Sequence, residues 1–169
     1  MPDITDLDQL DSALAPYIVD AISILGEDTK ETLIQLVREK WYGRIPSEWY
    51  QRSMDVLSSI SCSTVNRLGN EYIVEVYFDP DKIQPHEAAS SNMFPSHSNI
   101  TDGSSSFGGD SYGDLVPYWL NNGENSSIHS YDGEDVIEDT RQWLIEANNY
   151  LNEFASILRE KTGLNVVVA

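Results

Sequence analysis

A chain of 169 residues, 40% of them hydrophobic, has the size of one ordinary domain and can bury a core without a metal or a disulfide. Its 28 acidic residues outweigh 10 basic ones, and the resulting net charge of -18 repels nucleic-acid phosphates and argues against a conventional DNA- or RNA-binding protein. Three roles remain: a soluble acidic part of an assembly, a lining past which DNA slides without sticking, and a mimic that occupies a basic nucleic-acid site on another protein.

The composition also bears on location and redox chemistry. No apolar run approaches the roughly 20 residues that cross a bilayer, and the start, MPDITDLDQLD, is acidic where a signal or transit peptide would be basic. We expect no membrane association, and we expect the protein to stay in the cytoplasm of the cell that makes it. The single cysteine, Cys62, has no partner for an internal disulfide, and we expect it to be a small buried residue on a strand.

Residues 5–42 are predicted to form an N-terminal helical segment. From Asp6 to Leu25 the apolar residues fall at steps of three and four, which marks one face of an amphipathic helix. Pro16 interrupts this pattern, because a proline inside a helix removes a hydrogen bond and clashes with the preceding turn. We expect either a kink there or a second helix that starts near Ala15.

The second half of this segment has its own start signal. Gly26 is predicted to end the first element, and Asp28 with Glu31 resembles a capping box that begins another helix, running to about Tyr42. Its predicted buried face consists of Leu33, Leu36, Val37 and Trp41.

A β-hairpin is predicted next. Residues 60–67 are rich in Ser, Thr and Val, residues 71–78 alternate apolar and polar side chains, and the turn-forming Leu68-Gly69-Asn70 lies between them.

The Ser/Gly-rich loop 79–114 has few residues that could fill a core. A loop of this length is usually ordered only when other parts of a structure contact it, and we expect a partner chain to make these contacts. Asp79 with Asp81 could ligate a cation, and residues 102–110 are rich in oxygen ligands. Both lack the spacing of a calcium loop, so turn chemistry is the favoured interpretation and no metal site is expected.

The last part returns to regular structure. After an apolar stretch at residues 115–120 and a turn at Asn121-Asn122-Gly123, a long helix is predicted from Glu134, capped by Asp132 and ended by Gly163. The β-branched tail, residues 164–169, is predicted to add a strand to the hairpin sheet. The expected fold class is therefore α+β: a small twisted antiparallel sheet of hairpin and C-terminal strand, packed by the long C-terminal helix, with helices at the N-terminus, all in a single domain over residues 1–169.

No catalytic pattern stands out. His86, His97 and His129 all lie in predicted loops or turns, and the chain has no metalloprotease, serine-hydrolase or phosphate-loop motif. We expect no enzyme activity and no cofactor, although an enzyme with an unrecognised site is a third reading of the sequence.

Aromatic residues are the informative class, because they occur as three adjacent pairs. In each pair, one member can be buried while the other lies at the rim, or several can contact another subunit, and both can hold at once. Arg52 could likewise anchor an interface or pair with local carboxylates. The interface candidates are Trp41, Tyr42, Trp49, Tyr50, Arg52, Tyr118 and Trp119.

The order of short motifs is more specific than any one of them. In KWYGRIPSEWYQRSMDVLSSI, Trp41-Tyr42 is followed by Ile45-Pro46, then by residues 49–53 (WYQRS), and an apolar run leads into the hairpin. Later come PYWLNNG at residues 117–123 and LREKTGL before the valine-rich tail. This series, over roughly residues 30–168, resembles the tail-completion or head–tail joining proteins of tailed phages, often described as minor tail components. The loop 79–114 looks like an insertion in that pattern.

The resemblance implies a function and partners. It implies a structural virion protein of the neck, between the portal-bound adaptor and the tail tube, that forms a ring of six or more copies. DNA would pass through an acidic lumen of this ring without specific binding. The alternative is an acidic, nucleic-acid-mimicking inhibitor of a host DNA- or RNA-binding protein. A mimic needs its carboxylates in rows at phosphate-like spacing. In this sequence they are spread through predicted caps, turns and helix faces, which fits the connector role better.

Overall fold

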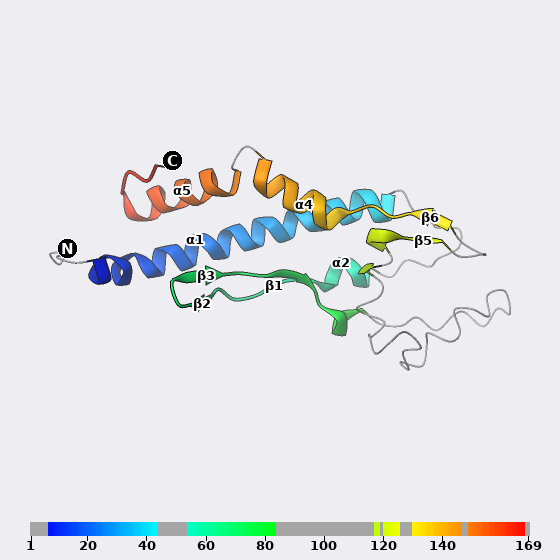
Figure 1. Cartoon of the computed structure of the whole chain (residues 1–169), viewed down its shortest axis with the longest axis horizontal. Coiled ribbons are helices and arrows are strands. Elements are labelled where there is room, and N and C mark those ends of the chain that lie inside the picture. Colours follow the sequence, from blue (N-terminus) through cyan, green and yellow to red (C-terminus); the bar gives the residue numbers. More distant parts are fainter. Residues whose placement is uncertain are drawn as a thin grey trace. The chain divides into compact units, whose positions relative to one another are not determined.

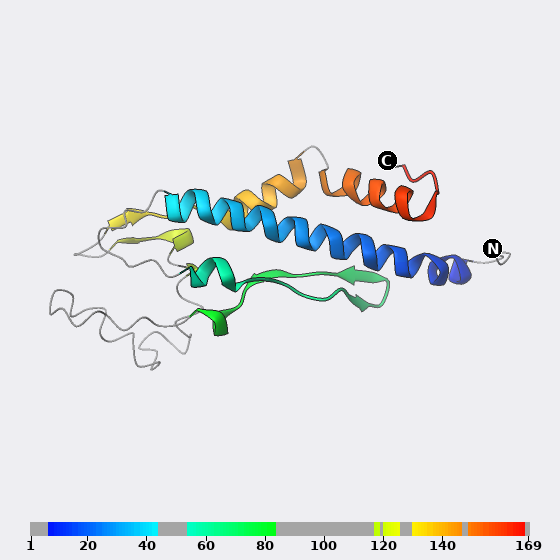
Figure 2. The same ribbon diagram turned by 180° about the vertical axis from the view of Figure 1, so that it is seen from behind.

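A computed structural model describes residues 7–43, 54–83, 117–118, 120–125, 130–146 and 149–167 (Figures 1 and 2). This part is mostly helical, with short antiparallel strand pairs, which agrees with the predicted α+β class. The elements are α1 (Leu7–Leu36), the π-helix η1 (Val37–Tyr42), α2 (Asp55–Ser59), β1 (Ile60–Cys62), β2 (Asn66–Leu68), β3 (Glu71–Ile73), β4 (Val76–Phe78), the 3-10 helix η3 (Pro80–Lys82), β5 (Gly123–Asn125), β6 (Ser130–Asp132), α4 (Val136–Ile145) and α5 (Asn149–Thr162).

The chain divides into two compact units, each built from separate segments. Unit 1 comprises Met1–Glu31, Cys62–Val76 and Thr140–Ala169, and unit 2 comprises Thr32–Ser61 and Tyr77–Asp139. The expectation of a single domain stays a prediction.

Helix α1 runs through both Pro16 and Gly26. Of the two alternatives predicted at Pro16, a second helix that starts near Ala15 is wrong, and a kink stays a prediction. The predicted helix end at Gly26 and the predicted new start at Asp28 are wrong, because both residues lie inside α1. A Cβ atom at Gly26 would lie 2.8 Å from Cys62 Sγ and 2.8 Å from Val74 Cγ2. The glycine is therefore needed for close approach of the helix to the hairpin, a long-range constraint that local stop signals do not contain.

The predicted hairpin is confirmed, with an interruption in each arm. β2 pairs with β3 antiparallel, β1 pairs with β4, and Gly69 has φ 64° in the turn, a conformation that favours glycine. Between the two ladders, Ser63 N donates to Glu75 O (2.8 Å) and Glu75 N donates to Ser63 Oγ (2.9 Å). The serine side chain thus replaces a backbone acceptor where the ladder is broken.

The C-terminal region departs from prediction in two ways. The expected single helix is divided into α4 and α5, and residues 164–167 are not a strand. Gly163 caps α5 as expected, with φ 70° and its N–H donating to Arg159 O (2.9 Å). After this cap, Arg159 Nε donates to Val166 O (2.7 Å). The chain therefore folds back on the end of α5 instead of joining the hairpin.

Within unit 1, α1 lies between the hairpin and α5 (Figures 1 and 2). Two ion pairs mark these opposite sides. Asp11 Oδ2 is 2.7 Å from Arg67 of β2, and Asp20 Oδ2 is 3.3 Å from Lys161 of α5. Because successive helical residues are about 100° apart, positions 11 and 20 lie on opposite faces of α1.

Candidate functional site

The candidate site lies in unit 2, which contains the three predicted interface residues that the structure describes. Trp41 and Tyr42 lie in η1, and Tyr118 lies in a short helical stretch before β5. The other candidates, Trp49, Tyr50, Arg52 and Trp119, lie outside the described residues.

Trp41 is the centre of the interior of this unit. Its side chain is 2% exposed, and its ring stacks on Phe78 with the centroids 5.6 Å apart. Its indole Nε1 donates to Glu134 O (2.7 Å), so the polar atom of this buried ring has a partner. Trp41 therefore offers almost no area to another subunit in this structure, whereas its neighbour Tyr42 is only half-buried. One member of this pair is buried and the other lies at the rim.

The predicted buried face around Trp41 is largely correct. Leu33, Val37 and Trp41 are all buried, and Leu36 is half-buried. Further buried apolar side chains of this unit are Val56, Ile60, Ile83, Pro117 and Val136.

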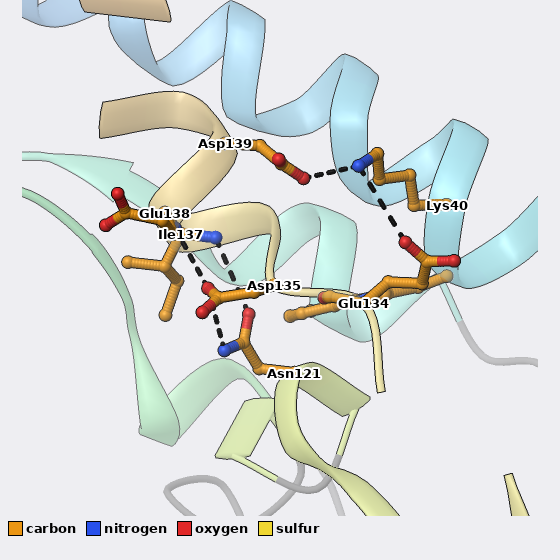
Figure 3. Close-up of polar contacts among 8 residues, drawn as sticks. Lys40, Asn121, Glu134, Asp135, Ile137, Glu138 and Asp139 are labelled. Atoms are coloured by element: carbon orange, nitrogen blue, oxygen red, sulfur yellow. Dashed lines mark hydrogen bonds and ion pairs between the residues drawn. The ribbon is translucent and has the colours of Figure 1, made fainter. Parts of the chain in front are cut away.

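Lys40, beside Trp41, forms the ionic part of the site (Figure 3). Its Nζ contacts Asp139 Oδ2 on α4 and lies 3.8 Å from Glu134 Oε2. All three side chains are partly shielded from solvent, which strengthens their attraction relative to a fully exposed pair. Lys40 and Trp41 thus bind the residues around the start of α4 by a charge contact and by a hydrogen bond.

The N-terminus of α4 is closed by a cap that joins it to the preceding segment (Figure 3). Asp135 Oδ1 accepts from Glu138 N (2.9 Å) and from Asn121 Nδ2 (3.0 Å), and Asn121 Oδ1 accepts from Ile137 N (3.5 Å). Asp135, not Asp132, is therefore the cap, and Asp132 ends strand β6. The sequence predicts only a turn at Asn121, so the bonds of its side chain to the start of α4 were not predicted.

Two exposed side chains lie on the segments that meet at this cap. Tyr118 is 62% exposed and Ile137 is 51% exposed, and they lie on the two segments that Asn121 joins. We call these two residues the Tyr118 patch. Apolar and aromatic side chains on a backbone fixed by hydrogen bonds lose little further freedom when they meet a partner, which suits protein contact.

The acidic turn at Asp79 and Asp81 is explained by local bonding. Asp79 Oδ1 accepts from Asp81 N (3.2 Å), and Asp79 Oδ2 lies 3.4 Å from Lys82 Nζ. Asp79 therefore caps η3, which agrees with the turn interpretation. Among the residues that the structure describes, no group of three His, Cys, Asp or Glu side chains is placed to hold a metal ion. Residues 102–110 and the three histidines lie outside them.

The described residues of unit 1 include ionisable groups whose pKa departs from its ordinary value. Burial, followed by the nearby Glu27 carboxylate, raises the pKa of the half-buried Cys62 thiol, so this group is protonated at neutral pH. Burial also raises the pKa of Glu153 on α5, and a hydrogen bond with Asp28 of α1 adds to this effect. Sequence spacing gave no signal for the contact between these two carboxyl groups.

Comparison with known proteins gives no identification: no family model, no curated protein and no solved structure matches this chain. Among the described helices, none is long and apolar enough to span a membrane.

Proposed function

We propose that this chain is a structural virion protein of the head–tail connector of a tailed phage, joining the portal–adaptor complex to the tail. The proposal starts from the motif series around Trp41-Tyr42 and residues 49–53 and from the net charge of -18, which suits a surface that faces packaged DNA. The finer architecture implied by the resemblance, a twisted sheet packed by one long C-terminal helix, is not part of this proposal, because the helix is divided into α4 and α5 and α1 lies between α5 and the hairpin.

The observation that carries the proposal is the Tyr118 patch. A protein that joins other proteins needs apolar contact surface on a fixed scaffold, and aromatic residues are enriched at such contacts. Tyr118 and Ile137 are exposed beside the hydrogen-bonded cap of α4, while Trp41 holds that cap from inside through Glu134.

Three of the described carboxylates are used inside the chain and are not free to imitate phosphates. Asp11, Asp20 and Asp139 face Arg67, Lys161 and Lys40 of the same chain, so these carboxylates balance internal cations. Inhibition of a host nucleic-acid-binding protein is therefore an outcome of the test and not a second proposal.

Deletion of the coding sequence from the phage genome that carries it, followed by complementation, tests the proposal. Without the protein, lysates should contain DNA-filled heads and separate tails under the electron microscope. Complementation with Tyr118→Phe should restore joined particles, and Tyr118→Asp should fail, because a buried carboxylate at a contact is unfavourable. Normal infectious particles from the deletion, or recovery of the protein only with a host nucleic-acid-binding protein, would refute the proposal.

A further inference from the structure

Residues Leu164–Val167, here called the tail segment, have the composition of a strand but pair with none in the described structure. The sequence LNVV is β-branched in half its positions, Leu164 is 48% exposed and Val167 is 73% exposed. Three of its hydrogen bonds lie within the chain end: Leu164 N donates to Thr162 Oγ1 (3.1 Å), Val166 N donates to Leu164 O (3.1 Å), and Val166 O accepts from the exposed Arg159 Nε (2.7 Å), a bond that strand addition would have to replace. Such a segment has high strand propensity and lacks the neighbouring strand that would bury it.

The hairpin of the same unit presents an edge that could accept a strand. In the part of the chain described, β2 pairs only with β3, so its other edge has no strand beside it. All three residues of β2 are exposed, and Leu68 is 71% exposed. Unpaired N–H and C=O groups along an exposed edge are a template for an added strand.

The tail segment does not reach this edge within its own chain. It follows α5, and α1 lies between α5 and the hairpin, held by Asp11–Arg67 on one side and Asp20–Lys161 on the other (Figures 1 and 2). Pairing in one chain would require the tail segment to cross the helix that separates them. A second copy of the chain has no such obstacle.

Charge also favours these two segments as the contact. With a net charge of -18, two copies repel over most of their surface. Residues 56–70 and 161–169 contain no aspartate or glutamate, and they include Arg67 and Lys161. Neither segment carries a carboxylate of its own, and the Asp11 carboxylate beside β2 is paired with Arg67.

We propose that the tail segment of one copy adds as a strand to the free edge of β2 in a second copy. The donor and acceptor surfaces differ, so each copy can give a strand to one neighbour and receive one from another, which generates a ring when the rotation closes. This inference rests on the proposed function, because a connector is built from repeated copies. It names the contact that would join those copies.

Cross-linking between copies tests the contact. In a Cys62→Ala background, Leu68→Cys and Val167→Cys are made separately, with one protein carrying a mass tag, and the purified proteins are mixed with a short bismaleimide. The mixture should give a cross-linked dimer that contains one of each chain, and the double variant should give a ladder of oligomers. A mixture that yields no mixed dimer, or a double variant that cross-links only within one chain, would overturn the inference.

A second pair of variants tests the role of the backbone. Replacing both Val166 and Val167 with proline removes two N–H groups that point to opposite sides of a strand, so pairing is lost in either register. Replacing both with threonine keeps the N–H groups and the β-branched shape. By sedimentation, the proline variant should associate at least ~10-fold more weakly than the threonine variant, with the same helical circular dichroism. Equal association of the two variants would contradict strand addition.

The two proposals fail separately. Cross-linking of the purified protein does not depend on a phage, and a deletion phage with normal particles would leave the strand contact standing while removing the connector role.

Discussion

The interior of unit 1 and the interior of unit 2 are packed in contrasting ways. Unit 2 buries large side chains around Trp41, including Val37 and Val136. Among the described residues of unit 1 the buried side chains are small, namely Ala21 on α1, Thr140 on α4 and Ala155 on α5, and a Cβ atom at Gly26 would clash with the hairpin.

This difference has a physical consequence. A unit packed by large side chains loses buried area and gains a cavity when a side chain is shortened. A unit packed by close backbone approach is damaged when a side chain is lengthened, because neighbours must shift. Unit 2 should therefore be sensitive to deletion of atoms and unit 1 to their addition.

The largest effect is expected for Trp41→Ala in unit 2. The variant removes the stacking on Phe78 and the hydrogen bond to Glu134 O, and it leaves a cavity. We expect the free energy of unfolding to fall by about 3–5 kcal/mol in a urea titration. The exposed Tyr118→Ala is the matched control and should change it by less than about 0.5 kcal/mol. Similar losses for both variants would show that Trp41 is not the centre of this unit.

Addition of one methyl group tests unit 1. Gly26→Ala places a Cβ atom 2.8 Å from Cys62 Sγ and Val74 Cγ2. We expect a loss of about 1–3 kcal/mol, although alanine is the better helix former. The control, Gly43→Ala, has helical φ and ψ and a nearest neighbour at 3.6 Å, so it should be neutral or stabilising.

A double variant locates the clash. In a Cys62→Ala background, Gly26→Ala should lose less stability than it does in the parent protein, because one of the two close atoms is gone. If Gly26→Ala is as well tolerated as Gly43→Ala, then unit 1 is not packed by close approach.

The same contrast explains which features the sequence predicts. The hairpin was predictable because its signals are local: alternation along residues 71–78 and a glycine at the turn, which has φ 64°. The buried face of Leu33, Val37 and Trp41 was predictable because helical spacing depends only on near neighbours.

The predictions that proved wrong concern features whose structure depends on residues far away in the sequence. Gly26 carries the local signal of a helix end, but Cys62 and Val74 determine its role. Asp132 and Asp135 are both acceptable helix caps by type, and Asn121, from another segment, bonds to Asp135. The tail segment has strand propensity, yet propensity does not say whether α1 lies between it and the hairpin.

The smallest effect concerns pH and the contact between α1 and α5. The pKa of Glu153 is raised from its ordinary value of 4.5 by burial and by Asp28. Just above pH 4.5 the native state therefore holds more protons than the unfolded state, so the contribution of Glu153 to stability is present below this pH and is lost as pH rises through the raised pKa. Glu153→Gln keeps the shape and cannot ionise, so it should be more stable than the parent at neutral pH, by about 0.5 kcal/mol, with the advantage vanishing toward pH 4.

The matched control for this experiment is Glu160→Gln, which removes the same charge from an exposed position of α5. Unfolding is followed by urea titration at several pH values, and only the Glu153→Gln curve should converge on the parent curve in acid. Because Asp28 and Glu153 both lie in unit 1, the same pH series run on Trp41→Phe, a unit 2 variant, should run parallel to the parent. Parallel curves for Glu153→Gln as well would mean that the carboxyl pair does not contribute to the packing of α5 on α1.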